Sequence, residues 1–484
     1  MPIKFLFKNL GIRQTIIKNT FWLASAEGIA RFFKLILIIY VARILGATEY
    51  GKFTFALNFV SLFVILSDFG LSAITTRELS QEKEKEKEFS ALLSLKIILS
   101  IIALFFILIG SFFVTSDLSI QKIIWILSIY ILFSSFSDII FAFLRARQKM
   151  EYEALTKILQ ALLITGVGLF VIFKIPSVKN LSYSYLFVSF VTLISILVFF
   201  HFKIASLKFS WKKSIWRNFL SLSWPLGIGA LLTAICVNIN SIIMGYLGLI
   251  TEVGWYNAAF KIINIVVIPS LLISQSFYPA LNKAFKESKD AFQKIWDYQL
   301  EIRVFFITPI IVGGIILAPK IIDFIYGSGF VPSVFVLQIL LVMGGLAYFS
   351  IIFYQALIIL NQQKKTLWIG FFGVIVDIVL SIILIIKFSL YGAVLASIIT
   401  YFLIFFLLFI FTSKFISIKI FDLRIFSSVF GAILSSIPMY FIISQKNIYH
   451  LNIFLIILIG VLIYSVVLFI YRKMLKIFSS VSNS

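Results

Sequence analysis

The sequence predicts an all-α polytopic membrane protein with about 14 transmembrane helices. Hydrophobic residues make up 61% of the 484 residues and charged residues only 13%. Soluble domains contain about 25% charged residues, so this composition excludes the soluble classes. A bilayer core takes about 20 apolar residues per helix. Divided at charged, glycine and proline breaks, the chain gives expected helices at 17–44, 50–76, 91–114, 119–144, 156–174, 181–202, 218–248, 253–280, 292–318, 333–361, 366–386, 389–412, 425–444 and 450–471.

Lys and Arg are divided unequally between the two sets of connections. Twenty-nine of the 42 basic residues fall in alternate connections and at the two ends of the chain, and eight fall in the remaining connections. Basic residues in short loops mark the cytoplasmic side. We therefore expect a multi-pass protein of the inner or plasma membrane with both termini cytoplasmic. The net charge of +22 follows from this topology, and no nucleic-acid partner is expected because no basic domain gathers the charge.

A short motif occurs twice along the chain. Residues 45–56 and 247–259 share Leu-Gly, then Thr-Glu, one residue, Gly, an aromatic residue and a start rich in small residues. Six predicted helices separate the copies, and six is even, so the two halves have the same orientation in the membrane. This predicts an N-terminal lobe at 1–206 with helices 1–6, a C-terminal lobe at 207–414 with helices 7–12, and two additional helices at 415–484. A chance match between two loops is the alternative.

Five basic residues lie inside predicted helices, where a charge is costly unless it faces protein or water. They are Arg31, Lys34, Lys96, Lys261 and Arg303. Glu27, Arg31 and Lys34 share one helix face, and Asn257, Lys261 and Asn264 repeat their spacing. We infer a water-filled cleft shared by the lobes, in which Arg31, Lys34 and Lys261 contact an anionic substrate. Arg303, Asn257 and Asn240 are further substrate-binding candidates. Two alternatives are structural: Glu27 and Arg31 neutralise each other, and Lys96 reaches the nearby cytoplasmic interface.

Coupling to a cation gradient would require a carboxylate that changes protonation state or binds sodium. Glu27, Asp68 and Asp377 are the ion-coupling candidates, although such acids can equally neutralise Lys96 or Arg303. The sequence contains no glycine-rich phosphate loop ending in Lys and Ser or Thr, and no paired Cys or His ligands. We therefore expect no metal, no cofactor and no ATP hydrolysis.

Several ordered motifs resemble one membrane-protein family. They are Tyr-Val-Ala-Arg-Ile-Leu-Gly at 40–46 with Tyr-Gly at 50–51, Ser-Asp-Phe-Gly-Leu at 67–71, Thr-Arg-Glu at 76–78, Phe-Leu-Arg-Ala-Arg-Gln-Lys-Met at 143–150, Trp-Pro-Leu at 224–226, Gly-Trp-Tyr-Asn-Ala-Ala at 254–259 and Ile-Tyr-Gly at 325–327. Over about 410 residues the chain resembles the Wzx-like polysaccharide biosynthesis flippases, a branch of the multidrug/oligosaccharidyl-lipid/polysaccharide exporter superfamily.

The resemblance implies fourteen helices in two V-arranged lobes. It also implies alternating-access transport of an isoprenoid-diphosphate-linked oligosaccharide from the inner to the outer leaflet, for cell-surface polysaccharides such as O-antigen. A polysaccharide polymerase and a chain-length regulator are the implied partners, and we expect a monomer. The acid usual in helix 7 of the family is Asn240 here, which argues against ion coupling by that helix.

The residues fit this function without any covalent chemistry. An anionic diphosphate cannot cross hydrocarbon unaided, and Arg31 could hold it through its planar fork while Lys34 and Lys261 act as point charges. A cation-coupled multidrug exporter of the same superfamily is one alternative, although cationic drugs favour an acidic or aromatic cleft. A membrane glycosyltransferase or polymerase is another. The longest expected outer connection, 318–332, has Asp323 as its only acid, so we expect no enzyme.

Overall fold

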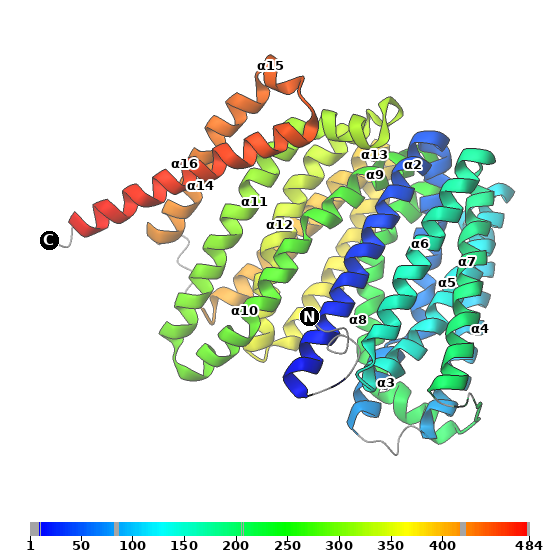
Figure 1. The fold of residues 1–484 in the computed structure, drawn as a ribbon. Coiled ribbons are helices and arrows are strands. Elements are labelled where there is room, and N and C mark those ends of the chain that lie inside the picture. Colours follow the sequence, from blue (N-terminus) through cyan, green and yellow to red (C-terminus); the bar gives the residue numbers. More distant parts are fainter. Residues whose placement is uncertain are drawn as a thin grey trace. The chain divides into compact units, whose positions relative to one another are not determined.

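The protein is helical throughout the part of the chain that the structure describes. The computed structural model describes residues 9, 11–81, 87–204, 206, 208–416 and 423–481, and no strand occurs among them. The contacts within the chain group it into two compact units, Met1–Gly254 and Trp255–Ser484. Figure 1 shows the fold. The predicted all-α class is confirmed.

The first unit contains the helices from α2 to α8. They are α2 (Ile12–Asp68), α3 (Leu71–Gln81), α4 (Phe89–Val114), α5 (Leu118–Ala146), α6 (Met150–Lys174), α7 (Val178–Lys203) and α8 (Lys213–Tyr246), followed by the start of α9 (Ile250–Val266). A straight helix of the length of α2 would measure about 85 Å, far more than a bilayer core. Gly46 interrupts α2 with a φ of 77°, a conformation that glycine adopts without strain. Since Figure 1 shows α3 at the same end as the start of α2, the halves of α2 run in opposite directions.

The second unit contains the remaining helices. They are the rest of α9, then α10 (Ile268–Glu287), α11 (Lys289–Tyr326), the short η2 (Ser328–Phe330), α12 (Ser333–Ile359), α13 (Gln363–Ser413), α14 (Leu423–Ser444), α15 (Lys446–Tyr449) and α16 (Ile453–Val481). Ser389 breaks α13 with a φ of 48°. Thr400 donates a hydrogen bond to Asp377 at 3.2 Å, and Gly373 packs against Ile404. Of these two contacts, the one with the lower residue number in the first half of α13 has the higher residue number in the second half. The two halves are therefore antiparallel.

Among the expected helix boundaries that differ from the structure, two have a clear local reason. The helix expected at 50–76 ends at Asp68, because Phe69 and Gly70 both have positive φ, 42° and 79°, which helical backbone does not allow. The helix expected at 253–280 is divided into α9 and α10, and Pro269 lies at the start of α10, where its missing N–H costs least.

The surface of the described helices suits a lipid environment. Large apolar side chains are widely exposed, including Phe113 at 76% and Phe202 at 77% of their area. Twelve helices of the described part are long and apolar enough to cross a membrane. Two of them contain the breaks at Gly46 and Ser389. If each half crosses separately, fourteen crossings result, and this count stays a prediction.

The two copies of the sequence motif have the same backbone turn and touch each other. Gly46 and Gly248 have φ values of 77° and 78°. The hydroxyls of Thr48 and Thr251 lie 2.8 Å apart. Gly51 packs on the backbone of Ile250, while Gly254 packs in the same way on the backbone of Ala47. These reciprocal contacts relate matching positions of the two copies. The lobes predicted at 1–206 and 207–414 and the helices at 415–484 stay predictions, because the two units are groups of contacts and not repeats.

Candidate functional site

The polar stripe on α2 is present and accessible. Arg31 Nε lies 2.7 Å from Glu27 Oε1, and both side chains are 57% exposed. Lys34, one turn further along, is also exposed. Among the described residues it has no hydrogen-bond or ion-pair partner, although the charges of Glu27 and Arg31 act on it. An exposed lysine in a membrane-spanning helix must meet water or a polar ligand. The stripe therefore presents an ammonium next to a guanidinium, and the binding of an anion there stays a prediction.

The candidates on α8 and α9 are more enclosed. Asn240 on α8 is 2% exposed and Asn257 on α9 is 4% exposed, while Lys261, one turn beyond Asn257, is partly buried. Each of the three has interactions within the protein. Their predicted contact with substrate stays a prediction.

Arg303 on α11 is fully buried in a polar network of the second unit. Its guanidinium donates to the hydroxyls of Ser270 and Ser274 on α10. It also donates to the carbonyl of Tyr348 at 2.7 Å and to that of Ser270 at 3.1 Å. The guanidinium lies 5.5 Å from the centre of the Tyr348 ring. Arg303 thus joins α10, α11 and α12, and four of its hydrogen bonds are made within the protein. The sequence indicated the buried charge but not these partners.

Asp377 is the buried acid of the second unit. It is 3% exposed, and one carboxylate oxygen accepts the hydrogen bond from Thr400 at 3.2 Å. Asp377 and Thr400 lie on opposite halves of α13, so the break at Ser389 brings them together. Ion coupling by Asp377 and Glu27 stays a prediction.

Asp68 lies at the end of α2 and forms an ion pair that corrects one expectation. Lys96 Nζ on α4 lies 2.8 Å from Asp68 Oδ1, and the lysine side chain is 0% exposed. Lys96 therefore does not extend to the interface as expected, because Asp68 satisfies its charge inside the unit. The Ser72 hydroxyl also donates to Asp68.

The ion pair borders a polar pocket of about 420 Å³. Asp138 and Arg145, both on α5, line it together with Asp68. The sequence placed Asp138 in a helix but offered no reason to select it, since its neighbours in space come from α2, α3 and α8.

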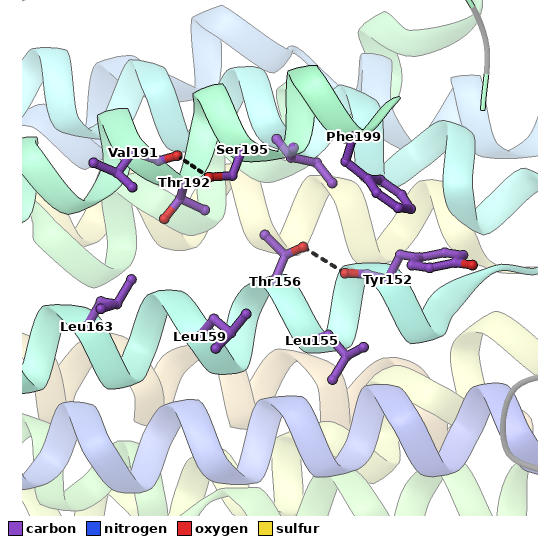
Figure 2. Close-up of a pocket in the computed structure, with 10 residues that line it drawn as sticks. Tyr152, Leu155, Thr156, Leu159, Leu163, Val191, Thr192, Ser195 and Phe199 are labelled. Carbon is purple, nitrogen blue, oxygen red and sulfur yellow. Dashed lines mark hydrogen bonds between the residues drawn. The ribbon is translucent and has the colours of Figure 1, made fainter. Parts of the chain in front are cut away.

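A second concavity, between α6 and α7, is apolar. Leu155, Leu159 and Phe199 are among its lining side chains, as Figure 2 shows. Its serine and threonine hydroxyls are bonded to their own helices: Thr156 donates to the Tyr152 carbonyl at 2.7 Å, Thr192 to that of Val188 at 2.8 Å and Ser195 to that of Val191 at 2.8 Å. It offers no charge for an anionic group, so we place no substrate head group there.

Comparisons with known proteins first define a class and then a family. The fold is that of exporters of the multidrug/oligosaccharidyl-lipid/polysaccharide superfamily. A structure of the lipid II flippase MurJ in an inward closed conformation has a TM-score of 0.71 at 19% identity and covers 93% of this chain and 98% of its own. An inward-facing multidrug resistance MATE family transporter has a TM-score of 0.66 at 15% identity and covers 80% of this chain and 94% of its own. At these identities the likeness shows the fold alone.

The family is shown by the sequence itself. The family model described as "Polysaccharide biosynthesis protein" matches residues 16–285, more than half of the chain. The chain belongs to this family, as its motifs predicted, and the family consists of transporters and not of enzymes. A relative from Haloferax volcanii, "Probable low-salt glycan biosynthesis flippase Agl15", is 21% identical over 393 residues, which cover 79% of this chain and 80% of the relative.

Proposed function

We propose that the protein flips an isoprenoid-diphosphate-linked oligosaccharide from the cytoplasmic to the outer leaflet by alternating access. Family membership and the glycan-flippase relative support a lipid-linked glycan as the substrate class. The observation that carries the proposal is the exposed pair Arg31 and Lys34 on a membrane-spanning helix. An anionic head group needs such cations to replace the water that it loses in the membrane.

The two cations would act differently on a diphosphate. The guanidinium of Arg31 can bind phosphate oxygens through two parallel hydrogen bonds. Glu27 now occupies one side of it, and an exposed pair of this kind contributes only about 0–1 kcal/mol. Phosphate can therefore displace Glu27 at little cost. Lys34 has no ion pair to break among the residues that the structure describes, and it would add a point charge. Lys261 is a further candidate from the second unit.

The experiment measures flipping by purified protein in proteoliposomes. The probe is a fluorescent isoprenyl diphosphate bearing a short oligosaccharide, and a membrane-impermeant quencher reports which leaflet holds it. Arg31→Ala should slow flipping by about tenfold or more, and Arg31→Lys should recover part of the rate because the charge remains without the fork. Lys34→Ala should also slow it. Lys122→Ala, which removes an exposed lysine at the start of α5, is the matched control and should flip normally.

Wild-type rates in well-inserted Arg31→Ala and Lys34→Ala proteins would contradict the anionic-substrate proposal. The same vesicles can then test a multidrug exporter, the alternative suggested by the fold shared with MATE transporters. A fluorescent organic cation replaces the lipid probe. If the Arg31→Ala and Lys34→Ala proteins still transport the cation, and no lipid is transported, the multidrug exporter is favoured.

The proposal extends to the cellular role. The flipped oligosaccharide would feed a surface polysaccharide such as O-antigen, and a polymerase and a chain-length regulator would act after the flippase. We propose a monomer in the plasma membrane with both termini cytoplasmic.

A further inference from the structure

The polar pocket of the first unit lies where four helices meet. Its lining includes Asp68 from the end of α2, Ser72 from α3, Asp138 and Arg145 from α5, and Ala230 from α8. The end of α5 that carries Arg145 is the one that the basic residues place on the cytoplasmic side. The pocket volume is about 420 Å³, which is enough for several water molecules.

The charged side chains around the pocket are not all directly paired. Lys96 is engaged by Asp68 at 2.8 Å. Arg145 lies 3.1 Å from Glu153, which also binds Lys157 at 2.8 Å. Among the described residues Asp138 has neither a hydrogen bond nor an ion pair, although its side chain is accessible. Three carboxylates and three basic side chains therefore surround the pocket, and Asp138 is the carboxylate of this set that no cation contacts directly.

The hydroxyls at the pocket leave Asp138 without a hydrogen bond from the residues that the structure describes. Ser135 is bonded to Ser67 at 2.7 Å, and Ser72 is bonded to Asp68. The Oγ atom of Ser134 is buried and forms no full hydrogen bond, although it interacts with the Tyr130 hydroxyl. A carboxylate without a protein donor must keep its water, because an unsatisfied polar group costs free energy.

We propose that Asp138 is a proton-binding residue whose protonation allows the pocket to close. Its carboxylate takes one proton from water in the open pocket and becomes a neutral carboxyl group. A dehydrated divalent metal ion fits poorly, because hard cations take about six oxygen ligands and most oxygens here are already bonded. A proton needs only the carboxylate. The proposal deepens the proposed transport function, on which its role in flipping rests.

Closure would involve α8. Ala230 forms the α8 part of the wall, one turn beyond Pro225, which lies inside the helix. Proline within a helix removes a backbone hydrogen bond and provides a place to bend. Gly227 packs directly on the ring of Phe69, at the elbow between α2 and α3. An ionised Asp138 must keep its water, whereas a neutral one can lose it at much lower cost. Protonation therefore favours the approach of α8 to α5.

The groups that bear on Asp138 come from several helices. The charged or titratable ones are Asp68 from α2, Lys96 from α4, Arg145 and Tyr130 from α5, and Lys157 from α6. The lining residues from α3 and α8 are Ser72 and Ala230, which do not titrate. A cation close to a carboxylate stabilises its charge, so the proton affinity of Asp138 depends on where the Lys96 ammonium lies.

The test follows the pocket directly and needs no transported substrate. Full-length protein carries Cys236→Ser, which removes the single native cysteine, and Ala230→Cys, which places a thiol in the pocket wall. The measurement is the rate of labelling by a small water-soluble thiol reagent, corrected for thiol ionisation, between about pH 5 and pH 8, where perturbed carboxyl groups titrate. We expect labelling at least about threefold slower at the acid end, because the closed form is then more populated.

Asp138→Asn should give slow labelling at every pH, since the amide imitates the protonated acid. Asp138→Glu should retain the pH dependence with a different midpoint, which keeps the test decisive if the Asn protein folds poorly. Asp117→Asn is the matched control, because it makes the same change at the other end of α5 and should behave as wild type. Labelling that does not depend on pH in the unsubstituted background, or an unchanged pH dependence in Asp138→Asn, would overturn the proposal.

The same proteins separate this proposal from the proposed function. A pH-dependent pocket in a protein that flips no lipid would contradict the transport function and leave the proton site. Normal flipping that is independent of pH and of Asp138, with a pocket that does not respond to pH, would contradict only the proton site.

Discussion

Arg303 shows how a buried guanidinium can be held inside a membrane protein by neutral groups, with no carboxylate bound to it among the described residues. Its partners are hydroxyls and carbonyls of α10 and α12. Gln355 extends the network by donating to the Ser274 carbonyl at 2.7 Å. Each carbonyl supplied to Arg303 belongs to a different helix from the arginine. The network therefore stabilises the packing of α10, α11 and α12 against one another.

This network predicts that Arg303 matters for stability before it matters for transport. Arg303→Ala would remove the donor to the Ser270 and Ser274 hydroxyls and to the Ser270 carbonyl, at a cost of about 3 kcal/mol, while the Tyr348 carbonyl would keep the hydrogen bond from the Ser270 hydroxyl at 2.8 Å. Arg303→Lys keeps the charge but offers one ammonium in place of a fork, so it should lose less. Thermal melting of purified protein, followed by tryptophan fluorescence, measures both. Wild-type melting of an Arg303→Ala protein that has lost flipping would instead support the predicted contact with substrate.

The residues that could be predicted from sequence are those whose type is unusual for their place. Arg31, Lys34 and Arg303 stand out because a charge among apolar residues is costly. Asp138 is also a charge among apolar residues, but the sequence does not single it out, because its significance depends on Lys96 being engaged by Asp68, 28 residues away along the chain. The pairing of charges within the membrane requires the packing of α2, α4 and α5.

At the scale of single helices, the start of α5 offers a test of local stability. Asp117 caps it by accepting a hydrogen bond from the Ser119 N–H at 2.7 Å. Asp117→Ala should lower the free energy of unfolding by about 1 kcal/mol, and Asp117→Asn should cost little because Asn also caps helices well.

The hydrogen bond from Ser119 lowers the pKa of the Asp117 carboxyl. The ionised cap therefore stabilises above the unfolded pKa of about 3.9 and loses its effect as the pH falls through the folded value. Melting of the three proteins at neutral and acid pH measures this, and equal melting of wild type and Asp117→Ala at neutral pH would refute it.

The reciprocal glycine contact between the two motif copies makes a second prediction about elements. A Cβ atom at Gly51 would collide with the Ile250 carbonyl, and one at Gly254 would collide with that of Ala47. Gly51→Ala or Gly254→Ala should separate the two turns, since overpacking costs about 1–3 kcal/mol. Cysteines at Thr48 and Thr251, whose hydroxyls lie 2.8 Å apart, should form a disulfide in the parent protein and a severalfold weaker one in either variant.

Gly166→Ala is the control for this experiment, because open space surrounds that glycine on α6. Undiminished cross-linking in Gly51→Ala and Gly254→Ala would show that the turns can adapt. The motif itself could be found in the sequence because its glycines and threonines repeat. Its contact could not, since it depends on how the chain folds back at Gly46 and Gly248.

For the whole molecule, composition was sufficient to predict an all-α membrane protein. Apolar runs located most crossings, because a bilayer imposes one length on every helix. Short-range backbone geometry decided the rest: Phe69 and Gly70 end α2 early, and the break at Ser389 turns α13 back on itself. At Ser389 hydropathy gives no sign of the break, because apolar residues continue on both sides of it.

The orientation of the whole chain in the membrane rests on the distribution of Lys and Arg and can be tested directly. In a Cys236→Ser background, cysteines at Ser116 and Ser177 should react with a membrane-impermeant thiol reagent added to intact cells. Cysteines at Lys208 and Lys286 should react only after the membrane is opened, because basic loops stay in the cytoplasm. Lys208 and Lys286 are exposed, as is Ser116, so failure to react in intact cells reports the side of the membrane and not burial. Reaction of the Lys208 position in intact cells would contradict the even number of helices before α8. It would also remove the argument that the two halves of the chain have the same orientation in the membrane.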